Sequence, residues 1–294
     1  MNESADVLSR VENLLTRLEA LLPNPPSPPD WTAARAFRWI RHHSARGTPQ
    51  GHGQLLPVRR PHRIRLDDLC GIDEQAQRIE QNTRQFIAGR HANNVLLTGA
   101  RGTGKSSLVK AMLDRFSDEG LRLIEMDRQD LMDLPEVVTL LTGRPERFII
   151  FCDDLSFESG DPGYKALKSV LDGSIAGVPE NLLIYATSNR RHLMPEYMDE
   201  NLETHRIGDE IHPGERVEEK ISLSERFGLW LSFYPFDQDH YLAICQYWVT
   251  ELGQGKARWN DTVRQEALQW SLSRGSRNGR VAWQFARDWV GRNV

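Results

Sequence analysis

The chain has 294 residues, of which 39% are hydrophobic and 27% charged, and its formal net charge is -4. This composition is typical of a globular protein with one large domain or two smaller ones. The net charge provides no overall attraction to nucleic acid, so binding of nucleic acid would need a local basic patch. Three widely spaced cysteines, Cys70, Cys152 and Cys245, favour reduced thiols over a disulfide framework or a zinc site.

The N-terminal segment predicts a helical extension. Apolar residues recur at helical spacing from residue 3 to residue 22, with charged residues between them. This apolar stripe packs either on the rest of the chain or on a partner chain. The proline-rich segment 23–29 then predicts an extended linker. Since the chain starts with a charged amphipathic stretch and has no run of 18 apolar residues, we expect a cytoplasmic protein without a membrane span.

A second short helix is predicted over residues 31–42. Aromatic residues and arginines are interleaved in this segment: Trp31, Phe37, Trp39, Arg35, Arg38 and Arg41. Such a helix either contacts nucleic acid through phosphate pairing and base stacking or packs its aromatic rings and exposes its arginines. The Gly-, Pro- and Arg-rich segment 44–60 predicts a domain boundary. Its histidines have no cysteine or carboxylate at metal-ligand spacing, so we expect no metal site there.

A short apolar strand at residues 95–97 leads into Gly99 to Ser106, which fit the phosphate-binding pattern G-x-x-x-x-G-K-[ST]. Its glycines let successive backbone N–H groups point at phosphate oxygens. Lys105 is expected to reach the β- and γ-phosphates, and the Ser106 hydroxyl to bind Mg²⁺. The cofactors predicted are therefore ATP and Mg²⁺. The predicted phosphate-binding residues are Gly99, Ala100, Arg101, Gly102, Thr103, Gly104, Lys105, Ser106 and Ser107.

Four more apolar runs predict strands, at residues 121–126, 147–152, 182–187 and 229–233. A helix capped by Asp73 precedes the first strand, and helical stretches lie between the strands, so the pattern predicts an α/β fold with a parallel five-stranded sheet and helices on both faces. After residue 236 the chain predicts three helices, near 238–252, 261–273 and 280–291. The expected domains are an N-terminal extension (1–60), an α/β domain (61–235) and a helical subdomain (236–294).

Two carboxylates, Asp153 and Asp154, follow the third of these strands. Ligands of open α/β sheets bind at the carboxyl ends of the strands, so both side chains are expected beside the phosphate loop. Asp153 is then a ligand of Mg²⁺, and Asp154 is a base that orients and deprotonates the attacking water.

This succession of motifs resembles the AAA+ ATPase superfamily over residues 61–294. The resemblance implies that Leu69 and Ile72 line an adenine pocket and that Asn189 helps to place the attacking water. It also implies that Arg226 reaches the γ-phosphate of a neighbouring subunit, which requires a homo-oligomer with shared sites. Arg280, opening the last helix, would belong to a C-terminal helical lid that senses the nucleotide. The other arginines that compete for these roles are Arg190, Arg191 and Arg277.

More narrowly, the strings at 61–69 and 186–193 resemble an uncharacterised bacterial AAA+ family, domain-of-unknown-function family 815. Most of the superfamily has glutamate where Asp154 stands, which implies slow hydrolysis, with Glu158 as a substitute candidate for the base. The acidic stretch 199–220 is expected to be an exposed insertion, either a solvated loop or a docking site.

The expected function is an Mg-ATP-dependent switch or remodeller of a protein partner. Two alternatives stay open: a DNA-associated ATPase resembling initiators or helicase loaders, and a nucleotide-binding scaffold with negligible hydrolysis.

Overall fold

The computed structural model describes residues 29–43, 49–157, 161–173, 177, 179–190, 193, 205–207, 210–212 and 223–294. The expected N-terminal helix and proline-rich linker, Glu158 and Arg191 lie outside these residues. Most of the acidic stretch 199–220 does so too; its described part is an antiparallel pair of short strands, β7 (His205–Ile207) and β8 (Glu210–His212).

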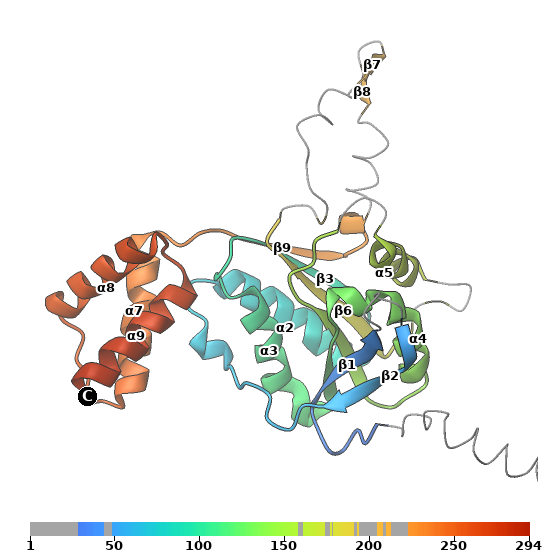
Figure 1. Ribbon diagram of the computed structural model, residues 1–294, viewed down its shortest axis with the longest axis horizontal. Helices are drawn as coiled ribbons and strands as arrows, with labels where there is room; N and C mark the ends of the chain where they lie inside the picture. Colours follow the sequence, from blue (N-terminus) through green and yellow to red (C-terminus); the bar gives the residue numbers. More distant parts are fainter. Residues whose placement is uncertain are drawn as a thin grey trace, which may run out of the picture.

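The five predicted strands are confirmed and form the parallel part of one sheet (Figure 1). Their order in the sheet is β4, β5, β6, β3, β9. All the pairings between these neighbours are parallel. Helices cover both faces of this sheet, so the central strands consist of apolar runs; every residue of β6 is buried. The bounds of the strands are β3 Val95–Gly99, β4 Leu121–Glu125, β5 Arg147–Cys152, β6 Leu182–Ser188 and β9 Leu229–Phe233.

Two further strands, β1 (Ala36–His43) and β2 (Pro49–Pro57), extend the sheet to seven strands. β1 pairs in parallel with β4, and β2 pairs antiparallel with β1. The prediction of a helix over 31–42 is therefore wrong, because strand pairing with β4, which is distant in the sequence, outweighs local preference. The boundary predicted at residue 60 is wrong as well, since the sheet already includes residues 36–57. A seven-stranded sheet replaces the five-stranded one.

The interleaved aromatic and basic residues of this segment do not form a stacking surface. Phe37 and Trp39 point to one face of β1 and are buried, with the Trp39 Nε1–H donating to Asp133 at 2.9 Å. Only glycine fits opposite that ring, because a Cβ at Gly53 of β2 would lie 1.9 Å from a Trp39 ring carbon. Arg38 forms a salt bridge with Asp127 at 2.7 Å. The aromatic rings thus serve the core and do not offer a surface to nucleic acid bases.

Two hydrophobic clusters flank the sheet, because successive strand residues face opposite sides. Val95 and Leu97 pack under α2 (Asp73–Ile87) and α3 (Lys105–Phe116). Leu96 packs on the other side, under α4 (Leu134–Leu141) and α5 (Pro162–Asp172). The N-cap of α2 is Ile72; the predicted cap, Asp73, is the first helical residue. Short 3-10 turns occur at Leu66–Asp68 (η1), Ser117–Glu119 (η2) and Arg128–Asp133 (η3).

The three predicted C-terminal helices are confirmed as α7 (Gln238–Gly253), α8 (Asp261–Arg274) and α9 (Gly279–Asn293). They enclose a separate hydrophobic cluster that includes Tyr241 and Phe285, and in Figure 1 they stand apart from the sheet, on the side where α2 and α3 cover it. The side chain of the residue before each helix accepts a backbone N–H, so all three N-termini are capped. Among the described residues, no helix combines the length and apolarity that a membrane span needs.

Candidate functional site

The loop between β3 and α3 depends on three glycines in the left-handed region, Gly99 (φ 126°), Gly102 (φ 75°) and Gly104 (φ 100°). Its start is fixed on the end of β9, where the Ala100 N–H donates to the Phe233 carbonyl at 3.1 Å. A Cβ on Gly99 would lie only 1.9 Å from that same carbonyl oxygen. The loop therefore sits at the carboxyl end of the sheet, at the N-terminus of α3, where backbone N–H groups favour an anion.

Lys105, the first residue of α3, folds its side chain back into this loop. Its Nζ donates to the carbonyls of Gly99 (2.8 Å) and Ala100 (2.7 Å) and to the Asn189 Oδ1 (3.1 Å). The residue is only 6% exposed. Burial lowers the pKa of this ammonium, and the nearby carboxylates of Asp153 and Asp154 act in the opposite direction. A cation so buried is held in place by oxygen atoms on several sides.

Asp153 stands at the end of β5 and joins α3 to β6. Its Oδ1 accepts hydrogen bonds from the Ser106 hydroxyl and the Thr187 hydroxyl, each at 2.6 Å. Thr187 also accepts the backbone N–H of Asp154 at 2.9 Å. Oxygen atoms from a hydroxyl and a carboxylate are the donors that Mg²⁺ prefers, so Ser106 and Asp153 fit that ion. The described residues contain no cluster of three or more His, Cys, Asp or Glu side chains suited to a metal.

Asp154 adopts a left-handed backbone conformation, with φ 53°, which is uncommon outside glycine. Its carboxylate accepts a short hydrogen bond from the Asn189 side-chain amide. Since Asn189 also accepts from Lys105, one amide side chain links the lysine of the loop with the second carboxylate of β5. Backbone strain of this kind is concentrated at functional sites.

The C-terminal helical subdomain docks on the loop through the first residue of α9. The Gly279 N–H donates to the Gly102 carbonyl at 2.8 Å. Asn278 caps α9 by accepting the Val281 N–H at 2.9 Å. Its side chain also lies against Gly102, where an added Cβ would be 2.7 Å from the Asn278 Cγ. Arg280 thus lies in the first turn of a helix that touches the loop; its side chain is exposed.

The predicted adenine segment lies between the loop and the helical subdomain. Ile72 is buried and would be 3.3 Å from a Cβ on Gly104, and Leu69 is half-buried at the edge of the same cluster. The segment is tied to α7 by the Tyr247 hydroxyl, which donates to Asp68 at 2.7 Å. Any ligand seated here contacts residues that bridge two parts of the fold.

This hydrogen bond changes the pKa of both partners. Burial raises the pKa of Asp68, but hydrogen bonds from Tyr247 and Arg65 outweigh it, so the net pKa lies below its usual value. Burial and the hydrogen bond to Asp68 raise the pKa of Tyr247 to about 12.

Arg226 stands apart from this group. It precedes β9 and forms a salt bridge with Asp172 at the end of α5. Arg190 is exposed, and its backbone N–H donates to the Ser188 hydroxyl at 3.2 Å.

The structure therefore brings together Lys105, Ser106, Asp153, Asp154 and Asn189, and it places Arg226 elsewhere. Thr187 and Asn278 were not predicted as parts of the site. The signal for Asn278 was present in the sequence as an Asn before the last helix; Thr187 reads as one more residue of a buried strand.

Comparison with known proteins gives a family and a fold. The sequence matches the family described as "Protein of unknown function (DUF815)" over residues 32–293. No curated protein matches it significantly.

Three solved structures illustrate the fold. Aeropyrum pernix ORC1 in complex with DNA is 14% identical with a TM-score of 0.51, over 77% of this chain and 62% of that one. A point mutant of Thermotoga maritima RuvB is 16% identical with a TM-score of 0.50, over 78% and 67%. The T. maritima RuvB Holliday junction branch migration motor is 18% identical with a TM-score of 0.45, over 76% and 63%. The chain thus spans less than two thirds of the ORC1 chain and of this last RuvB chain.

The first two likenesses agree with the expected α/β fold followed by a helical C-terminal region. The match over residues 32–293 takes in nearly all the described elements. The chain belongs to the DUF815 family.

Proposed function

We propose that this protein binds Mg-ATP at the loop Gly99–Ser107 and hydrolyses it by direct attack of water on the γ-phosphate. The observation that carries the proposal is the hydrogen-bonded connection from Lys105 through Asn189 to Asp154, beside the Ser106–Asp153 pair. These side chains come from α3, β5 and β6 and meet at one edge of the sheet, where parallel α/β folds hold ligands.

Each of these groups has a distinct part in the reaction. The backbone N–H groups of the loop and the Lys105 ammonium bind the phosphate oxygens and offset the charge that builds up during transfer. Ser106 and Asp153 would hold Mg²⁺, which would supply positive charge to offset the charge of the phosphates. Asp154 accepts the proton of the attacking water, and Asn189 fixes the direction of that carboxylate. Thr187 orients both aspartates.

Nucleotide state is proposed to move the helical subdomain. A phosphate chain in the loop lies next to Gly102, where α9 docks, and an adenine ring lies next to Ile72. Both contacts join the α/β domain to the helical subdomain. A bound nucleotide therefore changes the stability of the docked arrangement of the subdomain relative to an undocked one. Arg280 is the side chain that reads the phosphate from the subdomain.

Arg226 is proposed to act in a neighbouring copy of the chain. Its salt bridge with Asp172 holds it away from the loop of its own chain, which supports a role in trans. Turnover per subunit should then rise with protein concentration.

The test is a comparison of ATP binding and phosphate release in four variants. Lys105→Ala should lower ATP affinity at least tenfold, since it removes the buried cation. Asp154→Asn should bind ATP normally and lose turnover by about a hundredfold or more, the range of a lost general base. Arg226→Ala should lose turnover and keep its affinity. Glu119→Gln, an exposed substitution in the same domain, is the control and should behave as the wild type.

Unchanged turnover in Asp154→Asn would refute the role of that carboxylate. Absence of turnover in the wild type at every concentration, together with tight ATP binding, would favour the nucleotide-binding scaffold instead.

The work that hydrolysis drives is proposed to be the remodelling of a protein partner. A pull-down with the Asp154→Asn variant, held in its ATP-bound state, should retain that partner more strongly than the wild type does. The second candidate, an ATPase that works on nucleic acid, is favoured by one observation, a basic cavity far from the loop.

A further inference from the structure

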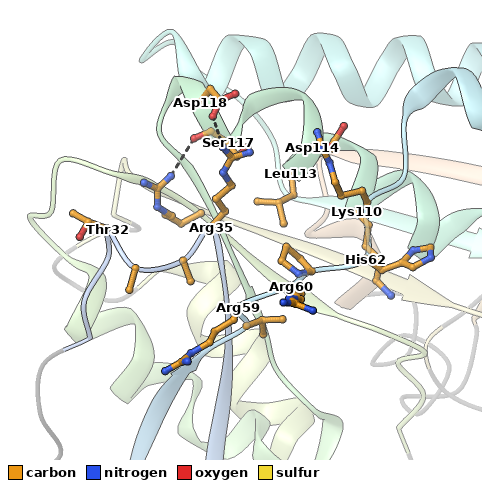
Figure 2. A pocket seen from close by; sticks show the side chains of 16 residues that line it. Thr32, Arg35, Arg59, Arg60, His62, Lys110, Leu113, Asp114, Ser117 and Asp118 are labelled. Carbon is orange, nitrogen blue, oxygen red and sulfur yellow. Dashed lines mark hydrogen bonds and ion pairs between the residues drawn. The ribbon is translucent and has the colours of Figure 1, made fainter.

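A cavity of about 690 Å³ opens at the end of the α/β domain opposite the phosphate loop (Figure 2). Its walls come from residues 32–35 before β1, residues 58–63 after β2, the second half of α3 with η2, and the start of β4. None of residues 99–107 lines it, and its lining on α3 begins at Lys110, about 8 Å along the helix from Lys105. The cavity is therefore distinct from the ATP site.

The lining of this cavity is strongly basic. Six cations and two carboxylates line it, which gives a local charge of +4 in a chain whose net charge is -4. The cations are Arg35, Arg59, Arg60, Arg63, Lys110 and Arg122, and the carboxylates are Asp114 and Asp118. Separate stretches of sequence contribute them, and for this reason the patch is hidden in the sequence.

Each of the two carboxylates pairs with one arginine of the lining. Arg35 pairs with Asp118 at 2.8 Å, and Arg63 pairs with Asp114 at 2.9 Å. Arg122 is occupied by backbone, because its Nη1 donates to the carbonyls of Ser117 (3.1 Å) and Leu121 (2.9 Å).

Three cations remain. Within the described part of the chain, Arg59, Arg60 and Lys110 have no carboxylate partner, and both arginines are exposed. Figure 2 shows all three at this cavity, Arg59 and Arg60 on the segment after β2 and Lys110 on α3, with the Arg59 and Lys110 side chains extending in different directions. Like charges held together repel one another and add nothing to folding stability, so their gathering indicates an anionic ligand.

The form of the cavity selects among anions. Among the described residues, no Phe, Tyr or Trp side chain lines it, so it offers no stacking platform for bases. It is open and its cations are mostly exposed, unlike a pocket that encloses a small molecule. Several separate cations over an open surface match the repeated charges of a phosphodiester backbone, which proteins hold without reading sequence.

We propose that this cavity binds the phosphate backbone of nucleic acid through Arg59, Arg60 and Lys110, without sequence preference. The inference deepens the second candidate function and gives the proposed ATPase a nucleic-acid partner. Binding itself does not need ATP, so the two proposals fail separately.

The experiment measures binding of a fluorescent 30-base-pair DNA duplex to the full chain between 50 and 200 mM salt. The triple variant Arg59→Glu, Arg60→Glu, Lys110→Glu should lose at least about tenfold in affinity at 50 mM. Each lost phosphate contact also lowers the slope of log affinity against log salt by about 0.9, so the slope should fall by up to about 2.7. Two duplexes of unrelated sequence should bind equally well.

The matched control reverses three exposed cations of the helical subdomain, Lys256→Glu, Arg258→Glu and Arg264→Glu. It changes the net charge equally and should keep most of the affinity. The Gln triple variant at residues 59, 60 and 110 should show an intermediate loss. ATP turnover without DNA and the thermal unfolding midpoint should be unchanged in all three.

The proposal is overturned if the wild type does not bind the duplex at 50 mM salt, or if both Glu variants weaken binding equally. It is also overturned if Lys105→Ala abolishes DNA binding, because the phosphate loop would then be the site. Normal DNA binding by Lys105→Ala with no turnover, by contrast, supports this inference whatever becomes of the remodelling function.

Discussion

The two ends of the α/β domain that we propose as anion sites differ in how their charged side chains are arranged. At the loop end, the polar side chains are largely turned toward one another: Lys105, Asp153 and Asn189 each have protein partners within hydrogen-bond distance. At the opposite end, Arg59 and Arg60 are exposed and have no carboxylate partner in the described chain. We therefore expect anion binding at the loop end to depend on the geometry of the loop, and binding at the basic end to depend on the number of positive charges. Changes of shape should therefore damage the first end, whereas changes of charge should damage the second.

The largest expected effect is that of Gly99→Ala at the loop end. A Cβ would lie 1.9 Å from the Phe233 carbonyl oxygen, and φ is 126°, so the backbone must shift and the free energy of unfolding should fall by about 3 kcal/mol or more. Gly143→Ala is the control: φ is 77°, but no atom lies within 4 Å, so the cost should be about 1 kcal/mol. Urea unfolding measures both. Equal losses would mean that the close contact between Gly99 and the Phe233 carbonyl of β9 adds nothing to the cost of the substitution.

A smaller loss is expected for Thr187→Val. This buried hydroxyl donates to Asp153 and accepts the Asp154 N–H. Its removal should lower the free energy of unfolding by about 2 kcal/mol and raise the Mg²⁺ concentration that turnover needs. Thr187→Ser keeps the hydroxyl and should lose only about 0.8 kcal/mol for the missing methyl group. If the Val variant keeps its normal magnesium titration, the Thr187 hydroxyl has no part in holding Asp153 for Mg²⁺.

The link between the α/β domain and α7 should cost less to break. Tyr247→Phe removes the hydrogen bond to Asp68, and the free energy of unfolding should fall by about 1.5 kcal/mol at pH 7. Tyr234→Phe, at an exposed tyrosine, is the control.

The effect of Tyr247→Phe should depend on pH at both ends. The folded pKa of Asp68 is lowered, so its contribution is present above its unfolded pKa of about 3.9 and is lost as the pH falls through the folded value. The folded pKa of Tyr247 is raised to about 12, so its contribution is complete below its unfolded pKa and is lost as the pH rises through about 12. A difference from the wild type that stays constant from pH 2 to pH 7 would contradict this account.

The smallest effect on stability is expected at the basic end. Arg59→Ala and Arg60→Ala remove exposed cations without a carboxylate partner in the described chain, so unfolding should change by no more than about 0.5 kcal/mol. Urea unfolding at 50 and 200 mM salt measures this. A loss of 2 kcal/mol or more would show that these arginines hold the fold together, and the contrast between the two ends would disappear.

The sequence predicted the parts of the fold whose signal is local. Strands such as β5 and β6 are continuous apolar runs bounded by turn residues, and the C-terminal helices carry their own caps, Asp237, Asn260 and Asn278. β1 and β2 escaped prediction because β1 depends on β4 in space, and Gly53 makes sense only opposite the Trp39 ring.

The candidate site divides in the same way. Lys105, Ser106 and Asp153 were found because a motif and a strand end mark them, and the structure brings them together. The basic cavity was not found because the fold adds Arg35, Lys110 and Arg122, from other segments, to the arginines of residues 59–63. Arg38 and Arg41, two of the arginines that the sequence analysis singled out, are paired with carboxylates. Long-range pairing of charges cannot be read from spacing.

The left-handed backbone at Asp154 limits which residues evolution or an engineer can place there. With φ at 53°, the left-handed backbone costs a residue longer than Asp or Asn about 1–2 kcal/mol of conformational free energy. A short polar side chain offsets part of this cost with a local hydrogen bond. A glutamate introduced here would also have a side chain one methylene longer, which displaces its carboxylate from the position that accepts the Asn189 amide. The shorter acid is therefore matched to its turn, and a glutamate in its place would need a new backbone path after β5.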